Sequence, residues 1–397
     1  ARPCIMGVRG QPRDRRRVTL PPALSLSPNL ARRFARRVLL LDEPVGDIGA
    51  ALAHHGYVQI DPIHVCGRMH DLILRNRVRD YTEGGLMRFL HGDGSPLPPQ
   101  QRTGFEHHLP ATNILAAFPL EAWPHLLGAM QHRARARSAW SGKLTPRERT
   151  LADRILAEIA ARGPLSSDEI DDSRRARRVW GAATLAKSTL QKLFFHGRVL
   201  ISHRVAQRRY YDLPERILPR DILSSPLPSS SDTARWLVRL KLRQRRLVTL
   251  KRDELPHVAD LVQPIAVNDC PRLFCLRTDL PVLDSVRASS EAHHPLAEST
   301  APSPLLLAPL DPLIYDRRVT RALWNFDYTW EVYTPPAKRI RGYYALPLLV
   351  GPEIAGHVDP KADRLNGRLR IVHRSVRRGF RAAPAVSALA RFLGLRP

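Results

Sequence analysis

The chain has 397 residues, of which 43% are apolar, and a mean hydropathy of −0.28, values typical of a globular protein with two to four domains. Its formal net charge is +26, and only seven of its 63 basic residues are lysines, so we expect a polyanionic partner, most simply nucleic acid. The apolar runs are too short for a membrane helix, and the four cysteines form neither a CxxC pair nor a zinc pattern, which fits a reducing cytosol.

In chain order, residues 1–28 predict a flexible basic tail, because prolines at its end interrupt regular structure. The apolar spacing then predicts helices over 29–41 and 45–55. An extended segment is expected over 57–61, and a mostly helical stretch over 67–91.

A second block has the pattern of a winged helix. A helix is expected over 145–162, Ser166 or Ser167 can cap another, and a further helix is expected over 181–196. Gly197 ends that helix, and the apolar period changes from 3.6 to 2 for two strands over 199–203 and 207–212. Winged helices usually bind DNA; a structural or protein-binding unit is the alternative.

The remaining chain contains two polar linkers, over 223–231 and 285–304. Between them we expect a helix and two strands, and after them short strands that suggest a small sheet or barrel, followed by a terminal helix. The expected elements are a helix over 234–252, strands over 273–276, 280–283, 328–333, 342–349, 354–359 and 368–372, and a helix over 384–393.

The tripeptide Gln59-Ile60-Asp61 places an amide and a carboxylate two residues apart in the expected extended segment. Positions i and i+2 of such a segment face the same side, so both groups could meet one substrate. By spacing alone, a polar strand face that ends in an Asp-Pro turn explains the motif equally simply.

Three other patterns in the sequence bear on its chemistry. The histidine pairs at 54–55, 107–108 and 293–294 have no second partner at metal-ligand spacing. The basic run of Lys338, Arg339 and Arg341 adjoins Tyr343 and Tyr344, a combination that suits phosphate contact plus base stacking; a tyrosine core with solvated charges is the alternative. No phosphate-binding glycine loop and no GxSxG motif is present.

Four stretches together resemble the AlkZ-like (YcaQ-type) winged-helix DNA glycosylases, in the order expected for that family. The first is VQIDPIHV with the residues that follow it, and the second is Phe105-Glu106 followed by a helical segment. The third consists of GPL together with GRVL and YDLPERILP, and the fourth lies in the C-terminal part of the chain. In the same order, the four stretches cover residues 58–77, 105–106, 163–165 with 197–219, and 310–364.

The resemblance implies an α+β fold, with tandem winged-helix units followed by a small C-terminal β-barrel-like domain. We therefore expect a first winged-helix unit with the catalytic motif, a second winged helix, a shortened third winged-helix-like unit, and a C-terminal β-rich domain with a terminal helix. These units span 29–140, 141–222, 232–284 and 305–397, respectively.

The resemblance also implies the activity: family members excise alkylated bases, and some unhook interstrand crosslinks. We expect a monofunctional DNA repair glycosylase for cationic N7-alkylated purines that needs no cofactor or metal. It would be a cytoplasmic, nucleoid-associated monomer whose partner is double-stranded DNA. The expected catalytic residues are Gln59, to orient water, and Asp61, as electrostatic stabiliser and general base; the expected DNA contacts are Arg68, His70, Arg77, Lys338, Arg339 and Arg341.

One departure keeps other functions open. Relatives read Phe-Glu-aromatic-Trp-Ala-His-Ala-Ala-Ser where this chain has FEHHLPATN, so Pro110 replaces the usual histidine. A proline side chain cannot donate a hydrogen bond to a base or phosphate. The main alternative is therefore a non-catalytic winged-helix DNA-binding protein or regulator, and a basic RNA-associated protein is a third possibility.

Overall fold

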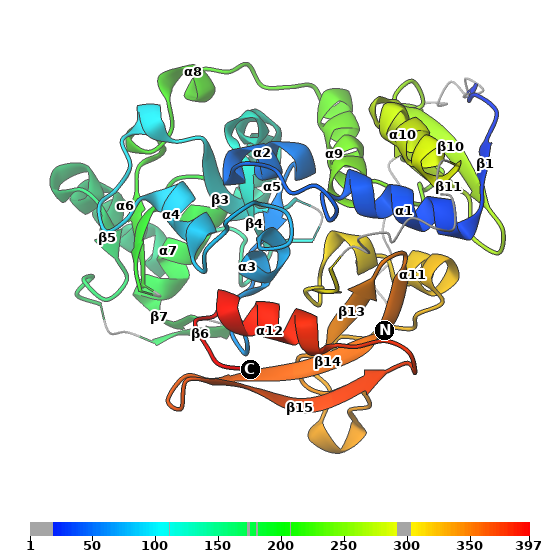
Figure 1. The fold of residues 1–397 in the computed structure, drawn as a ribbon. Helices are drawn as coiled ribbons and strands as arrows, with labels where there is room; N and C mark the ends of the chain where they lie inside the picture. The colour runs from blue at the N-terminus through cyan, green and yellow to red at the C-terminus, as the bar shows by residue number, and fades with distance from the viewer. Residues whose placement is uncertain (1–18, 111, 173–174, 180–181, 207, 292–302) are drawn as a thin grey trace, which may run out of the picture.

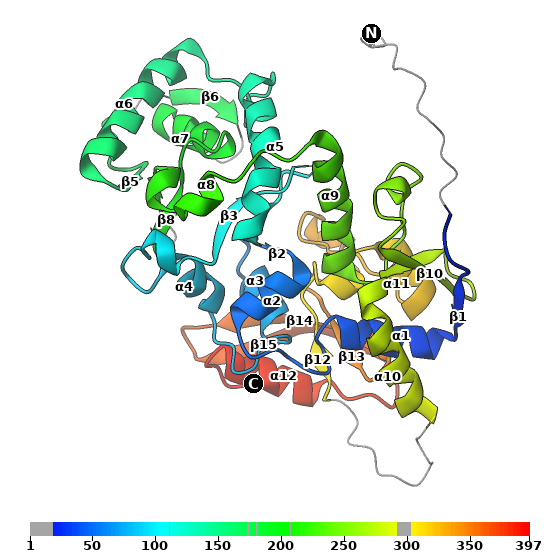
Figure 2. The ribbon, with the colours of Figure 1, turned by 90° about the horizontal axis from the view of Figure 1, so that it is seen from above.

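The computed structural model describes residues 19–110, 112–172, 175–179, 182–206, 208–291 and 303–397 (Figure 1). It is a mixed α+β structure in which small sheets are packed among helices, with the first unit between the second unit and the C-terminal sheet (Figure 2). Among the described residues, no helix is both long and apolar enough to cross a membrane.

The first unit surrounds an antiparallel sheet with the strand order β2-β4-β3. Asp47 caps its first helix by accepting from the Ala50 N–H at 2.7 Å, and Gly56 ends that helix at φ 77°. The helix expected over 45–55 is thus confirmed, whereas 67–91 forms two short helices. The elements are α2 (Ile48–His55), β2 (Val58–Gln59), α3 (Met69–Leu74), α4 (Gly85–His91), β3 (Gly104–His108), β4 (Leu115–Pro119) and α5 (Trp123–Arg135).

The second unit begins with the expected long helix, capped by Thr145 and Glu148 in a reciprocal box. Residues 167–172 form turns instead of the helix expected after Ser166, and Thr184 starts the next helix. The elements are α6 (Pro146–Arg162), β5 (Leu165–Ser166), β6 (Arg175–Val179), β7 (Ala182–Thr184), α7 (Leu185–Phe195), β8 (Leu200–Val205), β9 (Arg208–Asp212) and α8 (Arg220–Leu223).

These two units share one topology, which the sequence did not reveal as a repeat. In each unit a helix is followed by a short strand, β2 or β5, and later by a β-hairpin. The second strand of the hairpin lies in the middle of the sheet, which gives the orders β2-β4-β3 and β5-β9-β8. The order agrees with tandem winged helices. That interpretation stays a prediction, because a β6–β7 hairpin stands between β5 and α7 in the second unit.

The third unit draws on the N-terminal region. Leu24 to Leu26 form β1, which pairs in parallel with β10, so the end of the expected 1–28 tail is ordered strand; residues 1–18 lie outside the described residues. Residues 280–283 begin a helix, not the expected strand. The elements are β1 (Leu24–Leu26), α1 (Pro28–Val38), α9 (Ser230–Arg245), β10 (Val262–Val267), β11 (Leu273–Leu276) and α10 (Leu280–Glu291).

The C-terminal region contains an open four-stranded sheet, ordered β12-β13-β14-β15, so the expected barrel-like closure is wrong for the described residues. Residues 328–333 form a loop and not the expected strand, and the rings of Trp330 and Tyr333 meet within it at 6.2 Å. Helix α12 lies along the sheet (Figure 1). The elements are β12 (Leu305–Leu306), α11 (Arg317–Trp324), β13 (Leu346–Val350), β14 (Glu353–Asp363), β15 (Arg368–Val376) and α12 (Ala383–Phe392).

One hydrophobic core joins the first unit to the C-terminal sheet. Val58 and Ile60, which flank Gln59, share it with Tyr344 and Val358. Burial of such side chains stabilises the fold by roughly 1.5–3 kcal/mol each. The extended segment that carries the tripeptide is therefore fixed between two parts of the chain about 290 residues apart.

Candidate active site

The strand β2 carries Gln59 and ends there, and Asp61 lies two residues beyond it. Gln59 lies opposite Ala116 of β4, and the Ile60 N–H donates to the Leu115 carbonyl at 2.9 Å, so the ladder continues one residue beyond β2. Extended geometry places the side chains of positions 59 and 61 on one side. The shared side of Gln59 and Asp61 stays a prediction, because Asp61 lies beyond the last ladder bond at Ile60.

Gln59 carries a polar atom without a partner. Its side chain is 8% exposed, and its Oε1 is buried with no hydrogen-bond donor among the described residues. A buried acceptor left without a donor costs about 1–3 kcal/mol. Such a group is typical of a site that is completed by substrate or water.

Asp61 is half-buried and has no cationic partner among the described residues. Its Oδ1 accepts the Ile63 N–H at 2.9 Å, and no described residue donates to Oδ2. Burial raises the pKa of Asp61, and the hydrogen bond from Ile63 only partly opposes that rise. Two other buried carboxylates do have a cationic partner: Glu106 pairs with Arg204, and Asp311 pairs with Arg77.

Two aromatic side chains, Tyr344 and Trp330, belong to the hydrophobic core that also holds Ile60. Tyr344 is fully buried, and its hydroxyl has no partner among the described residues. Burial raises its pKa well above the usual value, and the charges of Cys66 and Asp61 add to that rise. The ring of Trp330 meets Tyr344 edge-on, with centroids 6.0 Å apart.

Of the three DNA contacts expected just after the motif in sequence, one is partly exposed and two are buried. Arg68 is half-exposed at the N-terminus of α3. His70 is 0% exposed, and burial lowers its pKa to about 4, so it is a neutral core residue. Arg77 is also 0% exposed and is bound to Asp311. Neither His70 nor Arg77 can reach DNA in this packing, so the expectation that they contact DNA is wrong.

The expected C-terminal contacts lie together on one loop. Lys338 is exposed, and the guanidinium of Arg339 stacks on Tyr343 at 4.8 Å from the ring centre. Arg341 is half-buried, with Nη1 3.8 Å from the Glu331 carboxylate. The loop thus offers Lys338 and Arg339 to a polyanion, while Arg341 is partly engaged within the protein.

Pro110 lies in the turn of the β3–β4 hairpin, so the helical segment expected after Phe105 and Glu106 is wrong. Phe105 packs on Phe118 and Trp123 within the hairpin core, and this packing favours strands over a helix. Because Ile60 bonds to Leu115 at the start of β4, this turn lies at the end of the sheet where Asp61 leaves it.

Sequence reasoning missed how fully the second unit buries its central helix. Within α7, Lys187 is exposed and Gln191 half-exposed, while the other side chains are buried. Lys192 is itself buried and bonded to Glu148 at 2.6 Å. In this packing α7 cannot enter a DNA groove. The alternation of apolar residues on all sides of the helix could have indicated its burial.

The histidine pairs within the described residues serve the core. His107 Nε2 lies 2.8 Å from the Phe194 carbonyl, and His108 stacks on Phe195 with ring centroids 3.9 Å apart. His54 Nε2 lies 2.8 Å from the Val38 carbonyl. The pair at 293–294 lies outside the described residues.

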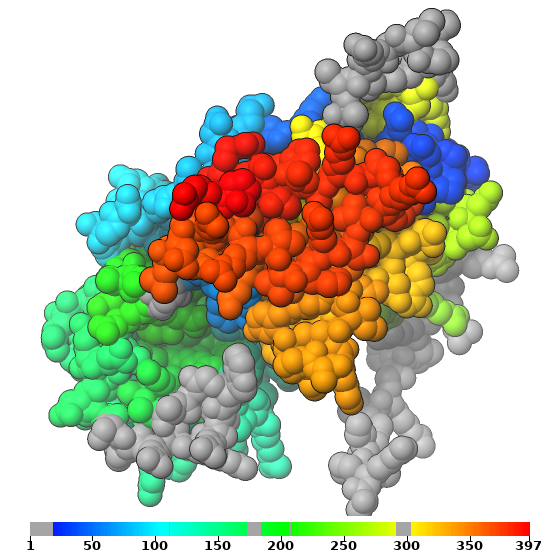
Figure 3. Space-filling view, turned by 60° about the horizontal axis from the view of Figure 1, so that its bottom comes forward, coloured from blue at the N-terminus to red at the C-terminus, as the bar shows by residue number. Residues whose placement is uncertain are grey.

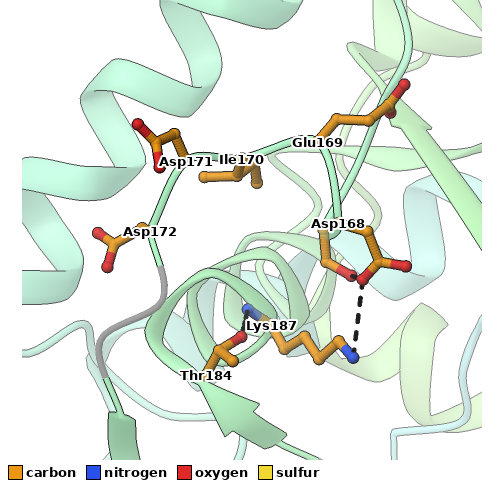
Figure 4. A pocket seen from close by; sticks show the side chains of 8 residues that line it. Asp168, Glu169, Ile170, Asp171, Asp172, Thr184 and Lys187 are labelled. Atoms are coloured by element: carbon orange, nitrogen blue, oxygen red, sulfur yellow. Dashed lines mark hydrogen bonds and ion pairs between the residues drawn. The ribbon is translucent and has the colours of Figure 1, made fainter.

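A surface depression of about 500 Å³ lies on the second unit, away from Asp61 (Figure 4). Asp168 Oδ1 is 3.7 Å from Lys187 Nζ there, and Thr184 accepts the Lys187 N–H at the start of α7. Its acidic lining would repel DNA phosphates, so this depression is no part of a DNA interface. Its lining residues are Ser167, Asp168, Glu169, Ile170, Asp171, Asp172, Thr184 and Lys187.

Comparison with known proteins identifies the family. A family model described as DNA glycosylase AlkZ-like matches residues 52–394. The chain is also similar to the solved structure of Streptomyces sahachiroi DNA glycosylase AlkZ, with a TM-score of 0.60 and 15% identity over 94% of this chain and 98% of that chain. At this identity the structural likeness establishes a shared fold, whereas the family match spans most of the chain. The chain therefore belongs to the AlkZ-like DNA glycosylase family.

Proposed function

We propose that this protein repairs DNA by hydrolysing the N-glycosidic bond of alkylated purines that carry positive charge at N7. The observation that carries the proposal is the half-buried Asp61, a carboxylate with no described cationic partner in a chain of net charge +26. A charge left uncompensated in this way is suited to stabilise a cation that forms only during reaction.

The chemistry needs few groups. An N7-alkylated purine leaves without a general acid, because the bond to the sugar breaks with its electron pair passing to an already cationic base. Positive charge then develops on the sugar, as in glycoside hydrolysis. Asp61 stabilises that charge and accepts the proton of the water whose oxygen bonds to the anomeric carbon.

Gln59 is suited to orient that water. Its buried Oε1, which lacks a donor among the described residues, can accept a hydrogen bond from the nucleophile. Its position on the same side as Asp61 would hold the water between amide and carboxylate, and such positioning removes much of the entropic barrier.

We propose a monofunctional enzyme. Base release coupled to strand cleavage requires an amine nucleophile. Among the described residues, no lysine forms a hydrogen bond or ion pair with Asp61. The product would be an intact strand with an abasic site. Where the alkyl group joins two strands, the same hydrolysis would unhook the crosslink.

The DNA would lie over the hollow seen in Figure 3, where a blue segment of the first unit is visible between the green second unit and the orange C-terminal loop. Arg68 beside the motif and Lys338 and Arg339 on that loop supply cations for phosphates. Such contacts release counterions, so binding is expected to weaken as salt rises.

A second function, DNA binding without catalysis, is favoured by Pro110 alone. Base release from duplex DNA that carries N7-methylguanine, followed by alkali and heat, separates the two. We expect strand breaks with the wild type and a loss of about 10²–10⁴-fold in rate for Asp61→Asn, the size of a general-base effect. Asp253→Asn, an exposed aspartate of the third unit, is the matched control. Wild-type rates in Asp61→Asn would refute the assignment, and tight salt-sensitive binding without any break would support the regulator.

A further inference from the structure

The C-terminal sheet ends at an open strand edge. In the order β12-β13-β14-β15, strand β15 pairs with a neighbouring strand on one side only (Figure 1). On its outer side the Leu369 N–H donates to the Arg396 carbonyl at 2.8 Å, and this short bridge covers the beginning of the strand. Over residues 370–376 no described strand pairs with the outer edge. The outward backbone N–H and carbonyl groups there can therefore receive an added strand.

The same stretch exposes apolar side chains. Residues 370–375 are all exposed, and among them Val372 is 64% exposed and Ile371 is 37% exposed. A long open edge pairs readily with other chains, so most sheets shorten it or cover it. An ordered edge that keeps two β-branched side chains in water is typical of a surface that a partner covers.

The open edge carries charge of a single sign. Arg368, Arg370 and Arg374 are all exposed along β15. Arg370 lies 2.7 Å from the Asp363 carboxylate, whereas the other two arginines have no carboxylate partner among the described residues. Opposite charges on neighbouring strands stabilise their pairing. The added strand that fits this edge is therefore acidic.

This charge disfavours a second copy of the chain as the occupant. Two copies of β15 paired antiparallel about Val372 would place Arg370 directly opposite Arg374. Pairing about Ile371 would place Arg368 directly opposite Arg374. Like charges in directly opposed positions destabilise a strand pair, so the edge is protected against pairing with itself.

Duplex DNA fits the edge less well than a peptide does. Phosphate oxygens can accept hydrogen bonds from the arginines and from backbone N–H groups, but they offer no donor to the outward carbonyl groups of β15. A peptide strand supplies donors and acceptors in alternation and would also cover Ile371 and Val372 with its own side chains.

We propose that β15 is a docking edge for an extended acidic segment of a partner protein, which pairs with residues 370–376 as a fifth strand of the C-terminal sheet. Main-chain hydrogen bonds supply the affinity, and carboxylates that face Arg368 and Arg374 supply the selectivity. The proposal is independent of the proposed reaction, because β15 contains none of the candidate catalytic or DNA-binding residues.

Fluorescence anisotropy with the full chain tests the docking edge. The probe is a short labelled peptide that alternates glutamate and valine. We expect it to bind the wild type, and we expect Arg374→Glu to weaken binding about 10-fold or more, because like charges then face each other. The matched control is Arg252→Glu, which reverses an exposed arginine of the third unit and should bind like the wild type. Equal affinities of the two variants would overturn the proposal.

A second probe tests the strand pairing itself. The same peptide with alternate backbone nitrogens methylated keeps its carboxylates but cannot complete a ladder, so it should not bind. Undiminished binding of the methylated peptide would show contact by charge alone and would refute an added strand.

Hydrogen exchange of residues 370–376 separates the possible occupants. Protection by the acidic peptide, and not by duplex DNA, supports the docking edge. Protection by DNA alone would assign the edge to DNA, and protection that rises with protein concentration without any ligand would assign it to a second copy; either result contradicts the proposal. Arg374→Glu should release N7-methylguanine at the wild-type rate. Absence of base release in the wild type, with the peptide still bound, would count against the proposed reaction and leave the docking edge in place.

Discussion

Arg77 and Asp311 form a two-point ion pair inside the protein, with Nη1–Oδ2 at 2.8 Å and Nη2–Oδ1 at 2.7 Å, although 234 residues separate them in the chain. Both side chains are fully buried. The pair joins the segment that follows α3 to the start of the C-terminal region. It thus links two parts of the chain that also share the hydrophobic core around Ile60.

Asp311→Asn should therefore destabilise the protein by about 3–5 kcal/mol, because it leaves the buried Arg77 charge without compensation. Chemical denaturation measures the change. Asp284→Asn is the control, since Asp284 is 72% exposed beside Arg287 and surface pairs contribute about 0–1 kcal/mol. Equal effects of the two substitutions would contradict a structural role for the buried pair.

Asp61→Asn should raise the melting temperature at neutral pH. Burial raises the pKa of Asp61, so the folded state disfavours the ionised form more than the unfolded state does. The destabilisation is absent below the unfolded pKa and develops as pH rises through the folded pKa. The variant and the wild type should therefore converge in acid. A variant that melts below the wild type at neutral pH would argue against an uncompensated carboxylate.

The raised pKa of Asp61 should also determine how the reaction rate falls toward acid pH. A general base must be ionised, so kcat/KM should fall as pH falls through the raised pKa of Asp61, which lies above the ordinary value of about 3.9. Base release measured from neutral to acid pH, with folding followed by circular dichroism, tests this. A rate that stays constant down to the ordinary value would show that Asp61 is not the base.

The sequence predicted the strand that carries Gln59 better than it predicted the surroundings. Gln59 and Asp61 could be placed on one side because strand geometry is local. The burial of Arg77 could not be foreseen, because its partner Asp311 is distant in sequence and the local pattern shows only a charge. The open sheet was mistaken for a barrel because strand alternation is the same in both; closure depends on whether β12 meets β15, which it does not.

Arg204→Met should loosen the contact between the first and second units. Arg204 Nε donates to Glu106 Oε1 at 2.8 Å, and His91 lies 2.5 Å from the same oxygen. Leaving the fully buried Glu106 carboxylate unpaired should cost about 3–5 kcal/mol. Adding Glu106→Gln should restore part of the loss. A double-mutant cycle in chemical denaturation measures the coupling, and strict additivity would contradict it.

Lys338→Ala should weaken DNA binding uniformly across sequences and reduce the slope of log K against log salt by about 0.9, the share of one phosphate contact. Lys251→Ala, which removes an exposed lysine of the third unit, should leave the slope unchanged. Fluorescence anisotropy over a salt series measures both. Equal slopes for the two variants would remove the loop from the interface.

The parallel pairing of β1 with β10 has a consequence for biosynthesis. Leu24 lies opposite Ile265, and helix α1 buries Phe34 in a core that includes Leu283 and Leu313. Contacts this distant cannot form while the chain emerges from the ribosome, whereas the second unit pairs mostly with itself and can fold early. The strand β1 and the helix α1 must therefore wait until partners about 240 residues later in the chain have been translated.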